Sequence, residues 1–251
     1  MIADALPWAV IVAPFIGSFI GVVVVRLPQG QALVAARSVC PACGTRLRAR
    51  ELIPLLSWLV QRGRCRSCGA AIGNFYPIIE LAALGIAVWA SLLASGWLLW
   101  VDCAFGWTLL ALAAIDQRHL VLPDVLVAPL VPAGLAVAYL TAPDALLDHA
   151  LGVAAGFLSF AAVRLVYHRV RGKEGLGWGD AKLLAAAGAW LSWQALPSVV
   201  LVSAIAALAA ALLARRWRGE ALSPSTRVAF GPYLCLGTWL VWLYGPLILS
   251  I

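Results

Sequence analysis

Charge is what this sequence has least of. Only 12% of its 251 residues are Asp, Glu, Lys or Arg, and only 11 of them are acidic. An ordinary soluble domain carries about a quarter of its residues charged. Together with a mean hydropathy of +0.95 and a hydrophobic fraction of 63%, this scarcity excludes an ordinary soluble domain.

Two further features are missing. The first apolar run has no basic residues before it, is too long for the core of a signal peptide, and reaches Arg26 without a small-residue cleavage site. We therefore expect it to be the first span of a polytopic protein. A Gly-rich nucleotide-binding loop after a strand is also lacking, so composition and spacing do not locate a cofactor site.

Long apolar runs are abundant, and several approach the roughly 20 residues that cross a bilayer as a helix. We predict an all-α polytopic membrane protein with about eight transmembrane helices. The segment 181–195 is short, so a re-entrant or partly submerged helix is an alternative there. The predicted spans are 5–25, 77–95, 97–115, 125–142, 149–167, 181–195, 197–214 and 232–250.

The basic residues all fall on one side of these spans or at their edge. The opposite loops carry acids, such as Asp144 and Asp148. Because cytoplasmic loops are enriched in Lys and Arg, we expect the basic side to be cytoplasmic and both termini to be periplasmic, in a bacterial inner membrane. The net charge of +7 then reports topology and attraction to anionic lipid, and no nucleic-acid partner is expected.

The largest cytoplasmic segment, 26–76, contains two Cys-x-x-Cys motifs, and we call it the Cys module. Four thiolates at this spacing suit tetrahedral Zn²⁺ in a closed structural site. Two disulfides are the alternative, and a reducing cytoplasm disfavours them. The intervening Leu52–Leu59 run is expected to form an apolar helix on the membrane or on the core. The four predicted ligands are Cys40, Cys43, Cys65 and Cys68.

Two acidic motifs stand at the ends of apolar runs. Asp116 directly follows the predicted span 97–115, and Asp180, within Gly177-Trp178-Gly179-Asp180, directly precedes the span 181–195. The topology puts both at one depth on the cytoplasmic side. Two carboxylates that share a site do not ionise together easily, so one can act as a general base while the other polarises a carbonyl group. Gly177 and Gly179 would let a substrate strand approach closely.

Structural roles are the alternatives for these acids: a helix cap for Asp180, or an ion pair with Arg118 or Lys182 for either. Asp124 is an alternative first catalytic acid, although it also suits a helix N-terminus after Pro123. Glu80 lies a few residues into a span, so we expect it to face the bundle interior or a wet cavity.

Taken together, these elements resemble the bifunctional type IV prepilin peptidases over nearly the whole chain. Gly21 departs from the resemblance, because the family commonly has Asn there, in a region connected with methyl transfer. The segments that carry the resemblance are Gly17-Ser18-Phe19, Arg26-Leu27-Pro28, the Cys module with Leu52–Trp58, Arg62–Cys65, Tyr76–Glu80, Asp116 with Leu122-Pro123-Asp124, and Gly177–Asp180.

The resemblance implies an aspartic protease with Asp116 and Asp180 as the catalytic pair. Its substrates would be type IV prepilins or type II secretion pseudopilins, cut at the cytoplasmic face between a basic leader and an apolar helix. It also implies N-methylation of the new N-terminus from S-adenosylmethionine, for which Gly63 and Arg64 are the candidate binding residues.

The expected organisation is a first transmembrane helix over 1–25, a cytoplasmic zinc-binding Cys module associated with methyl transfer over 26–76, and a transmembrane aspartic peptidase domain over 77–251. Two alternatives remain. One is an intramembrane protease of the presenilin kind, which shares the Gly-x-Gly-Asp element. The other is a non-enzymatic membrane protein that docks a partner through the Cys module.

Overall fold

The computed structural model describes residues 5–33, 38–172, 176–218 and 229–247. In these ranges the regular structure is helical, apart from two isolated β-bridges in the Cys module. The chain forms two compact units, residues 1–111 and 112–251, whose boundary falls inside one long helix, α4 (Trp97–His119). The all-helical prediction is therefore confirmed.

The first unit pairs α1 (Ala5–Arg26) with α3 (Phe75–Ser91). The two backbones approach closely: a Cβ atom at Gly17 would lie 2.6 Å from the Cα of Glu80. The indole of Trp107, on the first part of α4, donates a hydrogen bond to the carbonyl of Ala83 at 3.0 Å.

The Cys module lies in the chain between α1 and α3. It contains two short 3-10 turns, η1 (Leu27–Gln29) and η2 (Ala49–Glu51), and the five-residue helix α2 (Leu56–Val60). The predicted apolar helix over 52–59 is shorter than expected. Pro54 and the positive φ of Leu55 (+60°) precede α2, and neither is compatible with the interior of a longer helix.

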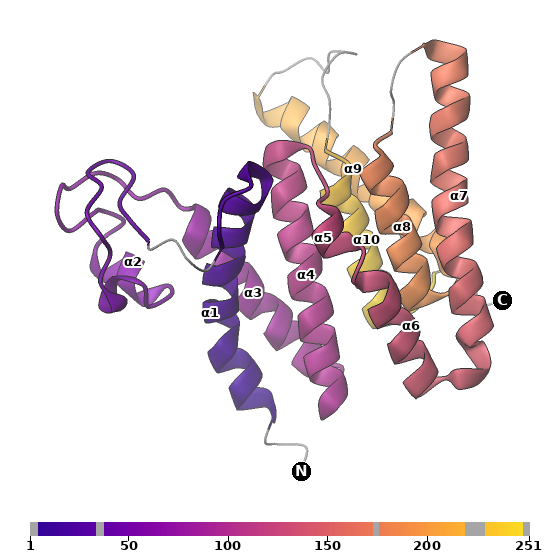
Figure 1. The fold of residues 1–251 in the computed structure, drawn as a ribbon, viewed down its shortest axis with the longest axis horizontal. Helices are drawn as coiled ribbons and strands as arrows, with labels where there is room; N and C mark the ends of the chain where they lie inside the picture. The colour runs from indigo at the N-terminus through magenta and orange to yellow at the C-terminus, as the bar shows by residue number, and fades with distance from the viewer. Residues whose placement is uncertain (1–4, 34–37, 173–175, 219–228, 248–251) are drawn as a thin grey trace. The chain divides into compact units, whose positions relative to one another are not determined.

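The second unit is built around α8 (Trp178–Leu191), which contacts α6 (Leu130–Thr141), α7 (Leu146–Arg171) and α10 (Gly231–Tyr244) (Figure 1). All residues from Ala185 to Trp190 are buried. Small residues allow this packing, because Gly152 and Gly156 bring α7 against the backbone of α8. The unit also contains α5 (Asp124–Val127), η3 (Pro143–Ala145) and α9 (Leu196–Arg218).

Five helical segments of the described chain are long and apolar enough to cross a membrane: 8–29, 97–119, 124–141, 143–171 and 196–217. The other three predicted spans also coincide with helices, but α3 has 17 residues and α8 and α10 have 14 each. The count of eight crossings therefore stays a prediction. Residues 1–4 of the first predicted segment and 248–250 of the last lie outside the described residues.

The predicted span 125–142 is divided into α5 and α6. Pro129 lies between them, and proline has no amide hydrogen for the helical ladder. The break falls directly after the short helix that begins at Asp124, next to the cavity described below.

Candidate active site and metal centre

Asp116 lies in the last turn of α4 and is 7% exposed. Its Oδ2 accepts a hydrogen bond from the amide of Gly231, the first residue of α10, at 3.0 Å. A Cβ atom at residue 231 would lie 2.6 Å from the same oxygen. Any other residue at position 231 would therefore displace the Asp116 carboxylate or one of the two helices.

Asp180 is the third residue of α8, and its Oδ2 accepts a hydrogen bond from the amide of Gly177 at 3.1 Å. This bond caps the helix, as the structural alternative for Asp180 predicted. A carboxylate in the first turn of a helix also interacts favourably with the helix dipole. Only Oδ2 of Asp180 accepts this capping hydrogen bond, so Oδ1 does not take part in it.

Both carboxylates line one cavity of about 430 Å³, together with Asp124, Gly177, Gly179 and Lys182. The turn after α4 forms one wall, and the first turn of α8 forms another. The walls meet where Gly179 faces Leu122, since a Cβ atom at residue 179 would lie 2.9 Å from the Leu122 Cβ. The structure thus brings together residues 64 positions apart (116 and 180) that the sequence placed at one depth.

Asp124 lies at the edge of this cavity and forms a salt bridge with Lys182, with both carboxylate oxygens 2.8 Å from Nζ. The two side chains are 67% and 43% exposed, so the pair is screened by solvent and contributes at most about 1 kcal/mol. Lys182 therefore pairs with Asp124, and the alternative in which it pairs with Asp116 or Asp180 is wrong.

The turn that carries Asp180 is fixed to α7 by aromatic and polar contacts. The guanidinium of Arg164 lies 5.0 Å from the ring centre of Trp178 and donates a hydrogen bond to the carbonyl of Leu176. The ring of Phe157 stacks on Trp178, with centroids 6.2 Å apart. These contacts hold both sides of Gly177, the residue whose amide binds Asp180.

Glu80 does not line this cavity. It is 5% exposed in α3, as predicted for a residue that faces the interior. Its Oε2 accepts a hydrogen bond from the amide of Leu55 at 2.7 Å. Glu80 therefore joins the Cys module to α3 within the first unit.

The four predicted metal ligands come together in the Cys module. The sulfur atoms of Cys40, Cys43, Cys65 and Cys68 all lie within 4.8 Å of one another. Each Cys-x-x-Cys turn is closed by the same hydrogen bonds, Gly44 N to Cys40 O and Gly69 N to Cys65 O, and both glycines have positive φ. All four thiols are free of disulfides.

The pKa values of three of these thiols shift in different directions. Hydrogen bonds from Thr45 lower the pKa of Cys43 to about 6, and the amides of Cys68 and Ser67 lower the pKa of Cys65. Although the amide of Ala70 opposes the change, burial and the neighbouring thiols raise the pKa of Cys68 to about 11. Closely spaced thiolates that oppose one another's ionisation are the donor set that a divalent thiophilic metal stabilises.

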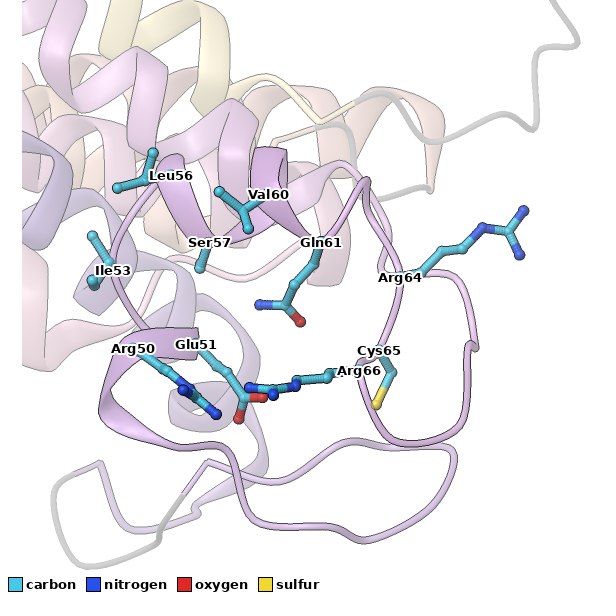
Figure 2. A pocket seen from close by; sticks show the side chains of 10 residues that line it. All are labelled: Arg50, Glu51, Ile53, Leu56, Ser57, Val60, Gln61, Arg64, Cys65 and Arg66. Atoms are coloured by element: carbon cyan, nitrogen blue, oxygen red, sulfur yellow. The ribbon is translucent and has the colours of Figure 1, made fainter.

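A second cavity, of about 450 Å³, lies within the Cys module. Its walls differ in character: Ile53, Leu56 and Val60 are apolar, whereas Glu51 and Arg66 on the opposite side are charged (Figure 2). Of the two candidate cofactor residues, Arg64 lines this cavity and its side chain extends away from the centre. Gly63 instead faces Trp58, whose ring lies 3.1 Å from where its Cβ would be.

Gly21, the departure noted in the sequence, faces the ring of Tyr76. A Cβ atom at residue 21 would lie 2.6 Å from Cδ1 of that ring. An asparagine at this position would require Tyr76 to move, so the glycine is matched to the packing of α1 against α3.

Gly231 and Arg164 were not recognised as site residues from the sequence. The signal for Gly231 is the pair Gly231-Pro232 at the start of the last apolar run, but its contact with Asp116 spans 115 positions. The sequence indicates Arg164 only as one of the basic residues at the edges of the predicted spans. Contacts of this kind depend on how the helices pack. The pattern of apolar residues along the sequence does not reveal that packing.

Comparisons with known proteins show the family of the chain. Residues 11–94 match the bacterial peptidase A24 N-terminal domain, and residues 103–212 match the type IV leader peptidase family. A protein of Aeromonas hydrophila is 39% identical over 277 residues, covering 97% of this chain and 94% of its own length. The chain belongs to the type IV leader peptidase family.

Two other members of the family give the same result. Proteins of Burkholderia pseudomallei and Pseudomonas aeruginosa are 41% and 38% identical; each covers 92% of this chain, and the matches span 83% and 87% of their own lengths. All three relatives are named prepilin leader peptidase/N-methyltransferase. No solved structure matches the chain. The family and the names of these relatives show that the protein is an enzyme of the peptidase class. The alternative of a non-enzymatic docking protein is therefore set aside.

Proposed function

We propose that this enzyme cleaves the basic leader from type IV prepilins or type II secretion pseudopilins, using Asp116 and Asp180. The observation that carries the proposal is the single cavity that both carboxylates line. The names of the relatives supply the substrate class. An apolar substrate helix would remain in the bilayer, and its leader would remain in the cytoplasm.

In the proposed mechanism the two aspartates share one proton. The ionised carboxylate takes a proton from water, and the resulting oxygen attacks the scissile carbonyl carbon. The protonated carboxyl donates a hydrogen bond to the carbonyl oxygen. The C–N bond of the tetrahedral intermediate then breaks, and the leaving amine takes the proton that the first carboxylate removed from water. The amides of Gly231 and Gly177 hold one oxygen of each acid, which orients the remaining oxygens. The pair titrates as a unit.

The proposed topology has eight spans, with the cavity at the cytoplasmic face of the inner membrane and both termini in the periplasm. Residues 1–25 form the first span, 26–76 the cytoplasmic Cys module, and 77–251 the transmembrane peptidase domain. The basic residues support this orientation, because Arg118, Arg164 and Lys182 all lie near the cytoplasmic ends of predicted spans.

Replacing either acid by asparagine tests the peptidase proposal. Asp116→Asn and Asp180→Asn should each lower leader cleavage by about 10²- to 10⁴-fold, the usual contribution of an acid–base group. Cleavage of a purified prepilin in detergent or lipid discs is measured by gel shift. Asp144→Asn, which changes an exposed acid in η3, is the matched control. Full cleavage by either active-site variant would refute the assignment.

We propose that the four-cysteine cluster holds one structural Zn²⁺ ion and that the neighbouring cavity holds S-adenosylmethionine. The metal would fix the two Cys turns, the second of which contains Arg66. The cavity suits the methyl donor, since its charged side offers Arg66 for a carboxylate and Glu51 for an ammonium group, and its apolar side could cover the adenine. The donor supplies the methyl group that the amine of the new N-terminus accepts.

The methylation proposal is tested with a prepilin and isotopically labelled S-adenosylmethionine. The mature pilin should carry one added methyl group on its N-terminal residue, as measured by mass spectrometry. Arg66→Gln should weaken this reaction and leave cleavage unchanged, whereas Arg215→Gln, far along α9, should change neither. A mature N-terminus without a methyl group would retain the peptidase and reject the second activity.

A further inference from the structure

The segment around α2 exposes large apolar side chains on the Cys module. We call Leu52, Ile53, Leu56, Leu59 and Val60 the apolar edge. They are between 40% and 74% exposed, with Val60 the most exposed. So many adjoining large apolar groups are unfavourable in water, and such surfaces mark contacts with a membrane or with another protein.

The hydrogen bond between Leu55 and Glu80 sets the depth of the apolar edge. Glu80 is the sixth residue of α3, so its 2.7 Å bond places residue 55 beside the second turn of that helix rather than beyond its end. Figure 1 shows the module beside α1 and α3. The same turn of α3 exposes Ile78 and Leu81, as expected of a helix that faces lipid.

Leu55 has an unusual backbone conformation at its hydrogen bond with Glu80. Its φ of +60° is unfavourable for any residue with a Cβ atom, and the buried carboxylate of Glu80 accepts a hydrogen bond from the amide of this same residue. The apolar edge is therefore held at this depth by a specific contact rather than by its own helical propensity, which is small for five residues.

Positive charge surrounds the apolar edge. Between residues 46 and 66 there are six arginines and one acid, and the segment stays positive even after four thiolates bind one Zn²⁺ ion. Three of the arginines, Arg50, Arg64 and Arg66, line the cavity whose apolar wall belongs to the apolar edge (Figure 2). Each basic residue near an anionic leaflet strengthens binding by about fivefold.

We propose that the apolar edge docks the Cys module onto the cytoplasmic leaflet of the membrane. Leu52 and Leu59, which do not line the cavity, lead the apolar edge into the boundary between headgroups and acyl chains. The arginines outside the cavity lining, Arg46, Arg48 and Arg62, pair with the phosphates of anionic phospholipids. The placement of the Cys module on the cytoplasmic side rests on the topology given with the proposed function. Docking would hold the module's cavity at the surface where the amine of a membrane-embedded pilin helix emerges.

Hydrogen–deuterium exchange of the full-length protein in lipid discs tests this proposal. Amides of residues 56–61 should exchange about tenfold more slowly in discs of phosphatidylglycerol than in discs of phosphatidylcholine. The double variant Leu59→Asn/Val60→Asn should lose this difference. Val170→Asn is the matched control, because Val170 at the end of α7 is 73% exposed, as Val60 is 74%, and it should keep the difference.

Three outcomes would overturn the proposal. One is equal exchange of residues 56–61 in both kinds of disc, and another is an unchanged lipid dependence in the double variant. The third is protection that requires an added prepilin whatever the lipid, which would make the apolar edge a substrate-docking surface. Leader cleavage measured in the same discs keeps these outcomes separate from a failure of the proposed peptidase function.

Discussion

At the scale of single residues, the amide of Gly231 holds one oxygen of Asp116 in the proposed catalytic pair. Gly231→Ala should lower leader cleavage by about ten- to hundredfold, because the added Cβ would lie 2.6 Å from Oδ2 of Asp116 and a displaced catalytic group is costly. Cleavage rate and thermal unfolding are measured together. Gly85→Ala is the control, since nothing lies within 4 Å of a Cβ there. Equal rates for both variants would contradict the role given to Gly231.

Thr45 forms hydrogen bonds with Cys43, one of the four proposed zinc ligands. Its hydrogen bonds hold the pKa of Cys43 near 6, so Cys43 is a thiolate above that pH and is available as a ligand. Thr45→Val removes the side-chain hydrogen bond and keeps the backbone one, so it should raise this pKa part of the way toward 9, and zinc should then be lost at a higher pH as the solution is acidified. Zinc content after dialysis at pH 5 to 8 is the measurement. Thr141→Val, whose hydroxyl donates to the carbonyl of Val137 within α6, should match the wild type.

At the scale of secondary-structure elements, α7 holds the turn that carries Asp180. Arg164→Ala removes the contact with Trp178 and the hydrogen bond to Leu176, and we expect kcat for cleavage to fall about tenfold with a smaller change in KM. Arg164→Lys should restore only part of the rate, because lysine lacks the planar guanidinium. Steady-state kinetics of both variants are compared with Arg169→Ala on the same helix. A loss confined to KM would show that Arg164 binds substrate instead.

The helices themselves were largely predictable, because apolar runs bounded by charges or Pro-Gly turns leave few alternatives in a membrane protein. The structure differs from the prediction where a single residue interrupts an apolar run. Pro129 breaks the helix within the expected span 125–142, although 124–141 remains long and apolar enough to cross a membrane. The positive φ of Leu55 shortens the apolar helix of the module to α2. Likewise, the grouping of the four cysteines follows from spacing alone, whereas the Lys182–Asp124 salt bridge depends on how α5 meets α8.

At the scale of the whole molecule, the two proposed activities belong to different units of the chain. The four-cysteine cluster and its cavity lie in residues 1–111, and the aspartate cavity lies in residues 112–251. Removing the metal with a chelator should therefore abolish methylation and leave most of the cleavage activity. Both products are followed by mass spectrometry from one reaction. Parallel loss of both activities would show that the metal supports the entire fold, and added zinc should restore methylation.

Helices α8 and α10 both begin at the aspartate cavity, and each has 14 residues. At 1.5 Å per residue each is about 21 Å long, whereas the hydrocarbon core of a bilayer is about 30 Å thick. Since α6, α7 and α10 surround α8, protein rather than lipid borders the end of this short helix, and in the proposed topology the mismatch leaves a depression in the protein surface above the two acids. Water that wets this depression is the second reactant of hydrolysis. The scissile bond of a pilin precursor would then meet water without its apolar helix leaving the lipid.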